Sequence, residues 1–272
     1  MPRDRPDGPH DRRSAPSASY ERDGDVGLVV LDDPPLNLFG DEMINDLIEA
    51  LEEAEGDMPR VLVVRAEGKV FTGGVDVQVF AGKTHEQGAA LFEDLVKIVH
   101  KLEDMPIPTV ASVHALCLTA GFELALGCDI LLAGKAAKFG LVERVVGLTP
   151  GMGGTQRVAE RAGPARAREL VMTGELYDAA TLERWNVVNR VFDDDALLGR
   201  TMAFARQLAI GPPKAHDATK RMVRAFLDEG GPRGADAHVG DIAAALFATE
   251  DLQNAVQTFL REGPGKATFE GR

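Results

Sequence analysis

Apolar residues follow two different patterns along the chain. Residues 41–56 and 88–106 place apolar side chains three and four positions apart, which is the spacing of amphipathic helices. Short, nearly continuous apolar runs of strand length lie between and beyond them, at 26–32, 60–67, 108–118 and 129–134. Because these runs alternate with helical segments, the pattern predicts an α/β fold.

The pattern changes at about residue 150, after which strands become rare. One short run at 187–192 still predicts a strand, and the sequence from Asp194 onward predicts helices separated by Gly- and Pro-rich stretches. The N-terminal segment is rich in Pro, Arg, Asp and Ser and contains little that could be buried. We therefore expect a disordered N-terminal tail over 1–25, a core over 26–193 and a helical C-terminal region over 194–272.

The charge and composition of the 272-residue chain disfavour several classes of protein. Its net charge of −13 argues against nucleic acid as a partner, since phosphate binding needs a basic surface. No apolar stretch of roughly 18 residues lacks glycine, threonine, serine or a charge, so no membrane span is expected. Residues 1–25 lack the apolar core of a signal peptide, which favours the cytoplasm. Cys117 and Cys128 lie in an apolar stretch and are expected to be reduced packing residues.

Two glutamates are candidate acid–base residues. Glu123 lies in "LTAGFELALGCD" (118–129) among apolar neighbours, and a glutamate is seldom buried without compensation. Because the flanking residues leave no polar face, we expect Glu123 to lie in a cleft or in the interior. Glu143 follows 20 residues later, and taken alone it would be a solvated charge beside Arg144. A helix, a strand and a short return between the two could bring their carboxylates together.

Two short segments could present free backbone N–H groups. "FTGGVD" (71–76) places a glycine pair after an expected strand, where the backbone can turn sharply. "TAG" (119–121) stands where a helix should begin, and the first N–H groups of a helix have no partner within it. Taken singly, the first segment would be an ordinary turn and the second a helix start in a tight core.

These segments together carry a family resemblance. "FTGGVD", the stretch from 118 to 158 and its "PGMGGTQR" motif (150–157) resemble the crotonase superfamily, the enoyl-CoA hydratase/isomerase group. The "PPLN" loop and the C-terminal end extend the resemblance over roughly residues 25–272. It implies a crotonase-like spiral of ββα turns, followed by a helical C-terminal trimerisation region. It also implies that the chain associates as a trimer or a hexamer.

The resemblance implies roles for individual residues. The backbone N–H groups of Val75 and Ala120 would bind the thioester oxygen of an acyl-CoA, because such donors stabilise the negative charge of an enolate. Glu123 and Glu143 would hold the water molecule that adds across the double bond. Contacts with the substrate are expected at Leu36, Gly73 and Asp76.

The chain departs from the family pattern near both ends of the expected substrate. Thr119 and Ala120 stand where glycines are usual, which keeps the N–H groups and adds side-chain bulk. Gln78 and Glu270 stand where basic residues commonly assist in binding CoA phosphates. Other cations would then have to contact the phosphates, and the candidates are Lys83 and Lys266.

We therefore expect an enoyl-CoA hydratase that forms a 3-hydroxyacyl-CoA in fatty acid metabolism. Family members that isomerise or cleave other bonds often keep one glutamate of the pair or neither, so the pair favours hydration. The alternatives are a double-bond isomerase, a thioester hydrolase and a non-catalytic acyl-CoA-binding protein. No metal is expected, and no cofactor apart from the coenzyme A of the substrate. The expected partners are an acyl-CoA and further copies of the chain.

Overall fold

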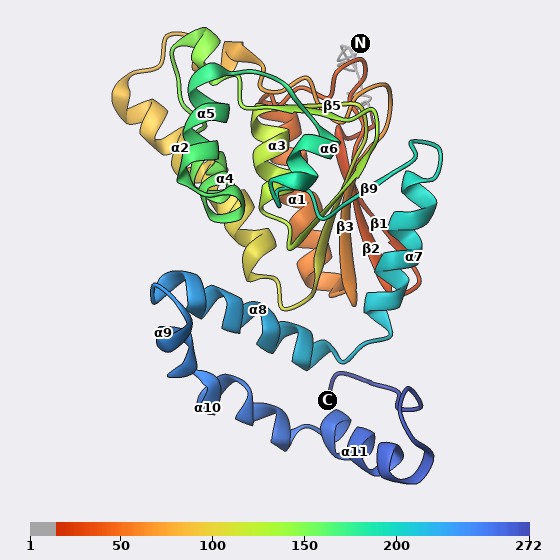
Figure 1. Ribbon diagram of the computed structural model, residues 1–272. Helices are drawn as coiled ribbons and strands as arrows, with labels where there is room; N and C mark the ends of the chain where they lie inside the picture. Colours follow the sequence, from red (N-terminus) through yellow and green to blue (C-terminus); the bar gives the residue numbers. More distant parts are fainter. Residues whose placement is uncertain (1–14) are drawn as a thin grey trace, which may run out of the picture.

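Residues 15–272 are described by the computed structural model, in which a central sheet stands between layers of helices and a helical arm extends beyond it (Figure 1). Its strands are β1 (Ala18–Asp23), β2 (Val26–Leu31), β3 (Val61–Ala66), β4 (Thr109–Val113), β5 (Leu116–Leu118), β6 (Ile130–Gly134), β7 (Lys138–Gly140), β8 (Tyr177–Asp178) and β9 (Arg190–Phe192). The α-helices are α1 (Asp41–Asp57), α2 (His85–Asp104), α3 (Thr119–Leu126), α4 (Gly154–Ala162), α5 (Pro164–Thr173), α6 (Ala179–Arg184), α7 (Leu197–Ala209), α8 (Pro213–Asp228), α9 (Pro232–Asp236), α10 (Val239–Ile242) and α11 (Glu250–Glu262). Short 3-10 helices are η1 (Val77–Phe80), η2 (Glu143–Val146) and η3 (Ala244–Ala248).

The strands form two sheets. The central sheet has the order β1-β2-β3-β4-β6-β9, and only its β1–β2 pair is antiparallel within the described residues. Parallel strands covered on both faces need apolar residues in continuous runs, and β2 is buried at every position. The smaller sheet has the order β5-β7-β8, and β5 leads directly into α3. The α/β fold and the helical C-terminal region expected from the apolar pattern are confirmed.

Helices cover both faces of the central sheet. On one face, α7 packs Met202 into an apolar cluster with Val63 of β3. On the other face, α1, α2 and α3 bury Leu47, Leu102 and Phe122 in the larger core cluster. The helices expected over 41–56 and 88–106 are therefore present, and α3 lies deep in the core between sheet and outer helices.

The expectation of a disordered tail over 1–25 is wrong for its last part. Residues Ala18–Asp23 form β1, which pairs with β2 along its whole length. The Ser17 hydroxyl and backbone N–H both donate to Asp46 Oδ2 of α1, at 2.8 and 2.7 Å. An edge strand is held mainly by its backbone hydrogen bonds, so it needs few apolar side chains. The pattern of apolar residues therefore did not reveal β1. Residues 1–14 of the expected tail lie outside the described residues.

Three further expectations are corrected between residues 69 and 140. The strand expected over 108–118 is divided into β4 and β5, because Ala115 between them adopts a positive φ of 48°. No strand forms over 69–72 among the described residues, where a single bridge joins Thr72 to Cys117. The turn expected after β6 contains β7, whose central residue Phe139 is fully buried. Strands of three residues are too short to produce a clear period.

The C-terminal arm comprises α8 to α11 and lies to one side of the core (Figure 1). Lys220 of α8 anchors it, because its ammonium group donates to the carbonyls of Leu102 and Ile107 and pairs with Asp129 at 2.9 Å. The end of the chain returns to the core, where Arg60 donates to the carbonyl of Phe269 at 2.8 Å. No helix within residues 15–272 is both long and apolar enough to cross a membrane.

Both cysteines are buried free thiols, as expected. Burial raises the pKa of Cys128 to about 12 and the pKa of Cys117 well above its usual range. Both thiols therefore stay protonated at neutral pH and act as small packing side chains.

Candidate active site

The loop of residues 73–76 and the start of α3 meet at the base of the candidate site. Phe39 donates its N–H to the carbonyl of Gly74 at 2.9 Å and accepts from the N–H of Asp76 at 3.1 Å. These two bonds leave the intervening N–H of Val75 free of backbone acceptors, and it donates to Thr119 Oγ1 at 3.0 Å. The structure thus brings Val75 together with the first turn of α3, which carries Ala120.

The close approach of this loop to α3 depends on Gly121. A Cβ atom at Gly121 would lie 2.0 Å from Cγ2 of Thr72, so any larger residue would push the two segments apart. Ala120 is almost fully buried, and within residues 15–272 its N–H has no protein acceptor. An N–H in the first turn of a helix has no partner inside the helix and lies at the positive end of the helix dipole.

The three residues expected to contact substrate occupy adjoining loops. Gly73 donates its N–H to the carbonyl of Leu36 at 2.7 Å, and the Leu36 side chain is partly exposed. Asp76 caps η1, because its Oδ1 accepts from the N–H of Gln78 at 3.0 Å. The geometry therefore gives Gly73 and Asp76 structural roles in the loop, and contact with a substrate stays a prediction for all three.

Asn37 organises this region and was missed by the sequence analysis. Its buried side-chain amide donates to the carbonyls of Glu67, Val70 and Phe71 at 3.0 to 3.2 Å. Its Oδ1 accepts from the N–H of Asp33 at 2.7 Å. The available sequence signal was the asparagine that ends the "PPLN" loop, because asparagine tolerates better than most residues the positive φ of 49° that it adopts here. Asn37 thereby ties the loop before α1 to the loop that precedes the glycine pair.

Glu123 is buried in α3, with 2% of its surface exposed, and it is compensated by backbone donors. Its Oε1 accepts from the N–H groups of Met152 at 2.9 Å and Gly154 at 2.8 Å. A Cβ atom at Gly154 would lie 2.7 Å from Cγ of Glu123, so glycine is required there. Burial nevertheless outweighs these donors and raises the pKa of Glu123 to about 7. The "PGMGGTQR" motif is thus the cradle of this carboxyl group.

Arg157 holds that cradle in place, and its role was also missed. Its guanidinium donates to both carboxylate oxygens of Glu103 at 2.7 and 2.6 Å, and to the carbonyl of Gly153 at 3.1 Å. Paired N–H donors matched to a carboxylate give both strength and a fixed orientation. Arg157 therefore links α2 to the turn that binds Glu123.

Glu143 is the first residue of η2 and is also buried, with 8% of its surface exposed. Neither carboxylate oxygen has a hydrogen-bond partner within residues 15–272. Burial and the charge of Glu123 together raise the pKa of Glu143 to about 7. The reading of Glu143 as a solvated charge beside Arg144 is therefore wrong, and Arg144 donates instead to the carbonyl of Thr173.

The two buried carboxyl groups form one electrostatic unit. Each has a pKa raised to about 7, and the charge of Glu123 disfavours ionisation of Glu143. Two interacting carboxyl groups lose their protons in steps that belong to the pair. Near neutral pH the pair therefore holds about one proton, which leaves one group able to accept a proton and the other able to donate one.

We expect Glu143→Gln to raise the free energy of unfolding at pH 8 by about 1–3 kcal/mol, because a buried charge without partners is removed. Glu143 ionises near 4.5 when exposed and near 7 in the folded protein. Between these pH values the folded state holds more protons than the unfolded chain, so its stability falls as pH rises. Urea unfolding at pH 5 and pH 8 measures the effect, with exposed Glu53→Gln as the control. An equal change at both pH values would contradict the burial of a titrating charge.

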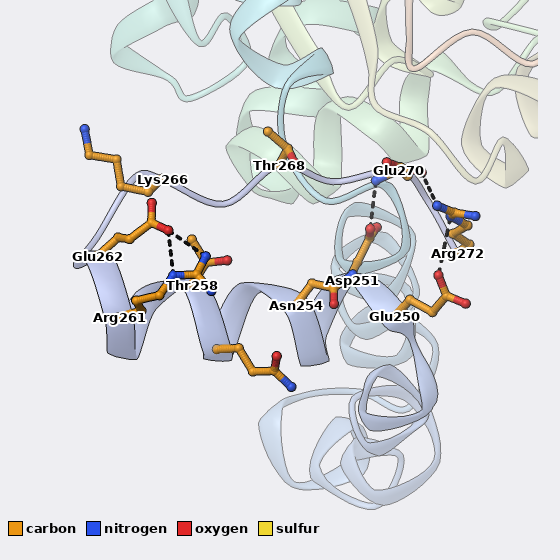
Figure 2. Close-up of a pocket in the computed structure, with 11 residues that line it drawn as sticks. Glu250, Asp251, Asn254, Thr258, Arg261, Glu262, Lys266, Thr268, Glu270 and Arg272 are labelled. Atoms are coloured by element: carbon orange, nitrogen blue, oxygen red, sulfur yellow. Dashed lines mark hydrogen bonds and ion pairs between the residues drawn. The ribbon is translucent and has the colours of Figure 1, made fainter.

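The C-terminal segment forms a polar groove with α11 (Figure 2). Asp251 is buried there, and its carboxylate accepts from the N–H groups of Glu270 at 2.7 Å and Gly271 at 2.8 Å. The side chain of Glu270 pairs with Arg272 at 2.5 Å, while Lys266 extends away from both in Figure 2. The segment is thus fixed by its backbone, and a role for Lys266 or Lys83 at CoA phosphates stays a prediction.

Comparison with known proteins gives consistent matches over nearly the whole described chain. The family model for enoyl-CoA hydratase/isomerase matches residues 21–272. The probable enoyl-CoA hydratase echA8 of Mycobacterium bovis is 33% identical, over 89% of this chain and 94% of its own. The 2,3-dehydroadipyl-CoA hydratase of Escherichia coli K12 is 31% identical, over 91% of this chain and 96% of its own. The solved structure of an enoyl-CoA hydratase subunit I from Geobacillus kaustophilus HTA426 superposes with a TM-score of 0.87 at 32% identity, covering 94% of this chain and 98% of that one.

Proposed function

This chain belongs to the enoyl-CoA hydratase/isomerase family, and we propose that it adds water to a 2-enoyl-CoA to give a 3-hydroxyacyl-CoA. The observation that carries the proposal is the pair of buried carboxyl groups, Glu123 and Glu143, whose pKa values are both raised to about 7. Addition of water needs one group that accepts a proton and one that donates a proton. A pair that holds about one proton supplies both at neutral pH.

The proposed reaction begins with the thioester oxygen accepting from the N–H groups of Val75 and Ala120. The ionised carboxyl group of the pair removes a proton from water as the water oxygen bonds to C3 of the enoyl group. The electrons of the C2–C3 double bond then move toward the thioester, and the negative charge collects on its oxygen, where the two N–H donors stabilise it. The protonated carboxyl group finally gives its proton to C2, so that the net change is the addition of one water molecule.

A panel of acyl-CoA thioesters, analysed by mass, tests this proposal. Crotonyl-CoA should gain the mass of one water molecule and lose its conjugated absorbance, whereas butyryl-CoA should remain unchanged. A 3-enoyl-CoA converted to its 2-enoyl isomer at the same mass would instead indicate isomerisation. Release of free coenzyme A would indicate thioester hydrolysis, and tight binding without turnover would indicate a non-catalytic binding protein.

We also propose that the chain assembles as a trimer or a pair of trimers through its C-terminal arm. The arm exposes large apolar side chains on α11 and η3, with Leu260 80% exposed. Contiguous exposed apolar surface usually marks an interface. These side chains are Phe247, Val256, Phe259 and Leu260.

Light scattering of the full chain at micromolar concentration is expected to give a mass of three or six subunits. Leu260→Glu should shift the population toward monomer, because a charge would be buried in the interface. Gln257→Glu on the same helix is the matched control and should keep the assembly. A monomeric full-length chain would contradict the proposal.

A further inference from the structure

The N–H groups of Val75 and Ala120, which would bind the thioester oxygen, form a candidate oxyanion hole. The hydroxyl group of Thr119 accepts a hydrogen bond from the first of these two donors. The N–H of Val75 donates to Thr119 Oγ1 at 3.0 Å, and the Thr119 side chain is buried, with 7% of its surface exposed. A Cβ atom at Gly74 would lie 2.5 Å from Thr119 Oγ1 and 3.4 Å from Cγ2. Both branches of the threonine side chain therefore lie against the peptide that joins Gly74 to Val75.

The backbone holds this side chain in place. Thr119 has a φ of 46°, a left-handed conformation that is unusual for a β-branched residue. The preceding strand is fixed, because Leu118 donates to the carbonyl of Thr72 and Thr72 donates to the carbonyl of Leu116. The following residues are the first turn of α3. Strained backbone persists where the surrounding structure determines it from both sides.

The N–H of Val75 carries one proton, and its acceptor position is occupied by the Thr119 hydroxyl. A thioester oxygen that accepts from both Val75 and Ala120 must therefore take the place of that hydroxyl or share the donor with it. We propose that Thr119 is a positioning residue that competes with the thioester oxygen for the N–H of Val75 and thereby weakens the binding of acyl-CoA. This inference rests on the proposed function, because it needs an acyl thioester as the ligand.

The competition affects substrate and transition state alike, since the hydroxyl group must yield the N–H in both. Loss of an interaction of this uniform kind changes KM and leaves kcat nearly constant. A hydroxyl group that instead donated to the enolate oxygen would contribute to kcat. The division of the effect between KM and kcat therefore separates a competing acceptor from an additional donor.

The test compares three variants at residue 119 with the wild type. Thr119→Ala removes the hydroxyl, Thr119→Ser retains it without the methyl group, and Thr119→Gly removes it in a residue suited to the positive φ. Calorimetry measures binding of butyryl-CoA, and of the thioether S-butyl-CoA, which has no carbonyl oxygen. We expect Thr119→Ala and Thr119→Gly to bind butyryl-CoA about 2- to 10-fold more tightly than wild type, the effect of one net hydrogen bond. Thr119→Ser should match the wild type, and S-butyl-CoA should bind equally well to all variants. With crotonyl-CoA, Thr119→Ala and Thr119→Gly should show a correspondingly lower KM and a nearly unchanged kcat.

Two results would overturn the inference while leaving the proposed function intact. One is unchanged or weaker binding of butyryl-CoA by both Thr119→Ala and Thr119→Gly. The other is a large loss of kcat in these two variants that Thr119→Ser does not share, which would make the hydroxyl a donor. A wild-type protein that neither binds butyryl-CoA nor hydrates crotonyl-CoA would overturn the proposed function, and this inference with it.

Discussion

Glu143→Gln is expected to lower kcat by about 10²–10⁴-fold while the protein stays folded, because a general acid–base group typically contributes that much. Glutamine has nearly the same shape as glutamate and cannot exchange a proton at neutral pH. Glu143 makes no hydrogen bond with another described residue through its carboxylate, so the change removes no observed contact. Stopped-time assays with crotonyl-CoA at saturating concentration measure the loss directly.

Glu123→Gln is expected to lower kcat by a similar factor. Here the substitution must also preserve the hydrogen bonds that hold the side chain. Glu123 Oε1 accepts from two backbone N–H groups, and the amide oxygen of glutamine can accept the same bonds. The variant should therefore remain folded, as circular dichroism and thermal melting can verify. Exposed Glu53→Gln is the control for both substitutions and should keep full activity. Near wild-type turnover by folded Glu143→Gln would exclude the mechanism with two carboxyl groups.

Val75→Pro is expected to lower kcat/KM by about 10²–10³-fold, because proline removes one of the two donors to the oxyanion. The hydrogen bonds on either side of Val75 do not use its N–H, since Phe39 bonds with the carbonyl of Gly74 and the N–H of Asp76. The substitution should therefore leave the local backbone pairing intact. Steady-state hydration of crotonyl-CoA measures the effect.

Val77→Pro is the matched control for this substitution. Val77 is the first residue of η1, a position where helices tolerate proline. The Val77→Pro variant should keep a kcat/KM close to that of the wild type. If both proline variants melt like the wild type and Val75→Pro is fully active, the N–H of Val75 is not a donor to the reacting oxygen.

Long periodic segments explain why so much of the fold could be predicted from the sequence. The helices expected over 41–56 and 88–106 correspond to α1 and α2, because their apolar positions repeat over several turns. β1 was missed because its outer residues are exposed and polar, and its stability comes from backbone pairing with β2. Local patterns identify an element by its buried face and fail where an edge strand has little of one.

The burial of Glu123 could be predicted from the sequence, whereas the contacts of the candidate site could not. Apolar neighbours correctly indicated the burial of Glu123, whereas Glu143 stands beside Arg144 in a sequence that suggests a surface. Its burial results from the tertiary packing of η2, which contacts α5, and no local pattern encodes that packing. The hydrogen bond between Val75 and Thr119 joins residues 44 positions apart and depends on the positive φ of Thr119. The sequence could therefore show only that threonine is bulkier than the glycine usual at this position.

The strand order of the central sheet also bears on how the chain folds during its synthesis. β2, β3, β4, β6 and β9 succeed one another across the sheet in the order in which they are translated. Each of these strands can therefore join an existing open edge as it leaves the ribosome, and none must be inserted between two strands that already pair. The bond from Arg60 to the carbonyl of Phe269 can form only after Phe269 has been made, when all of these strands are already available. The layers that hold the carboxyl pair can thus assemble first, and the segment around Phe269 can pack against them only afterwards.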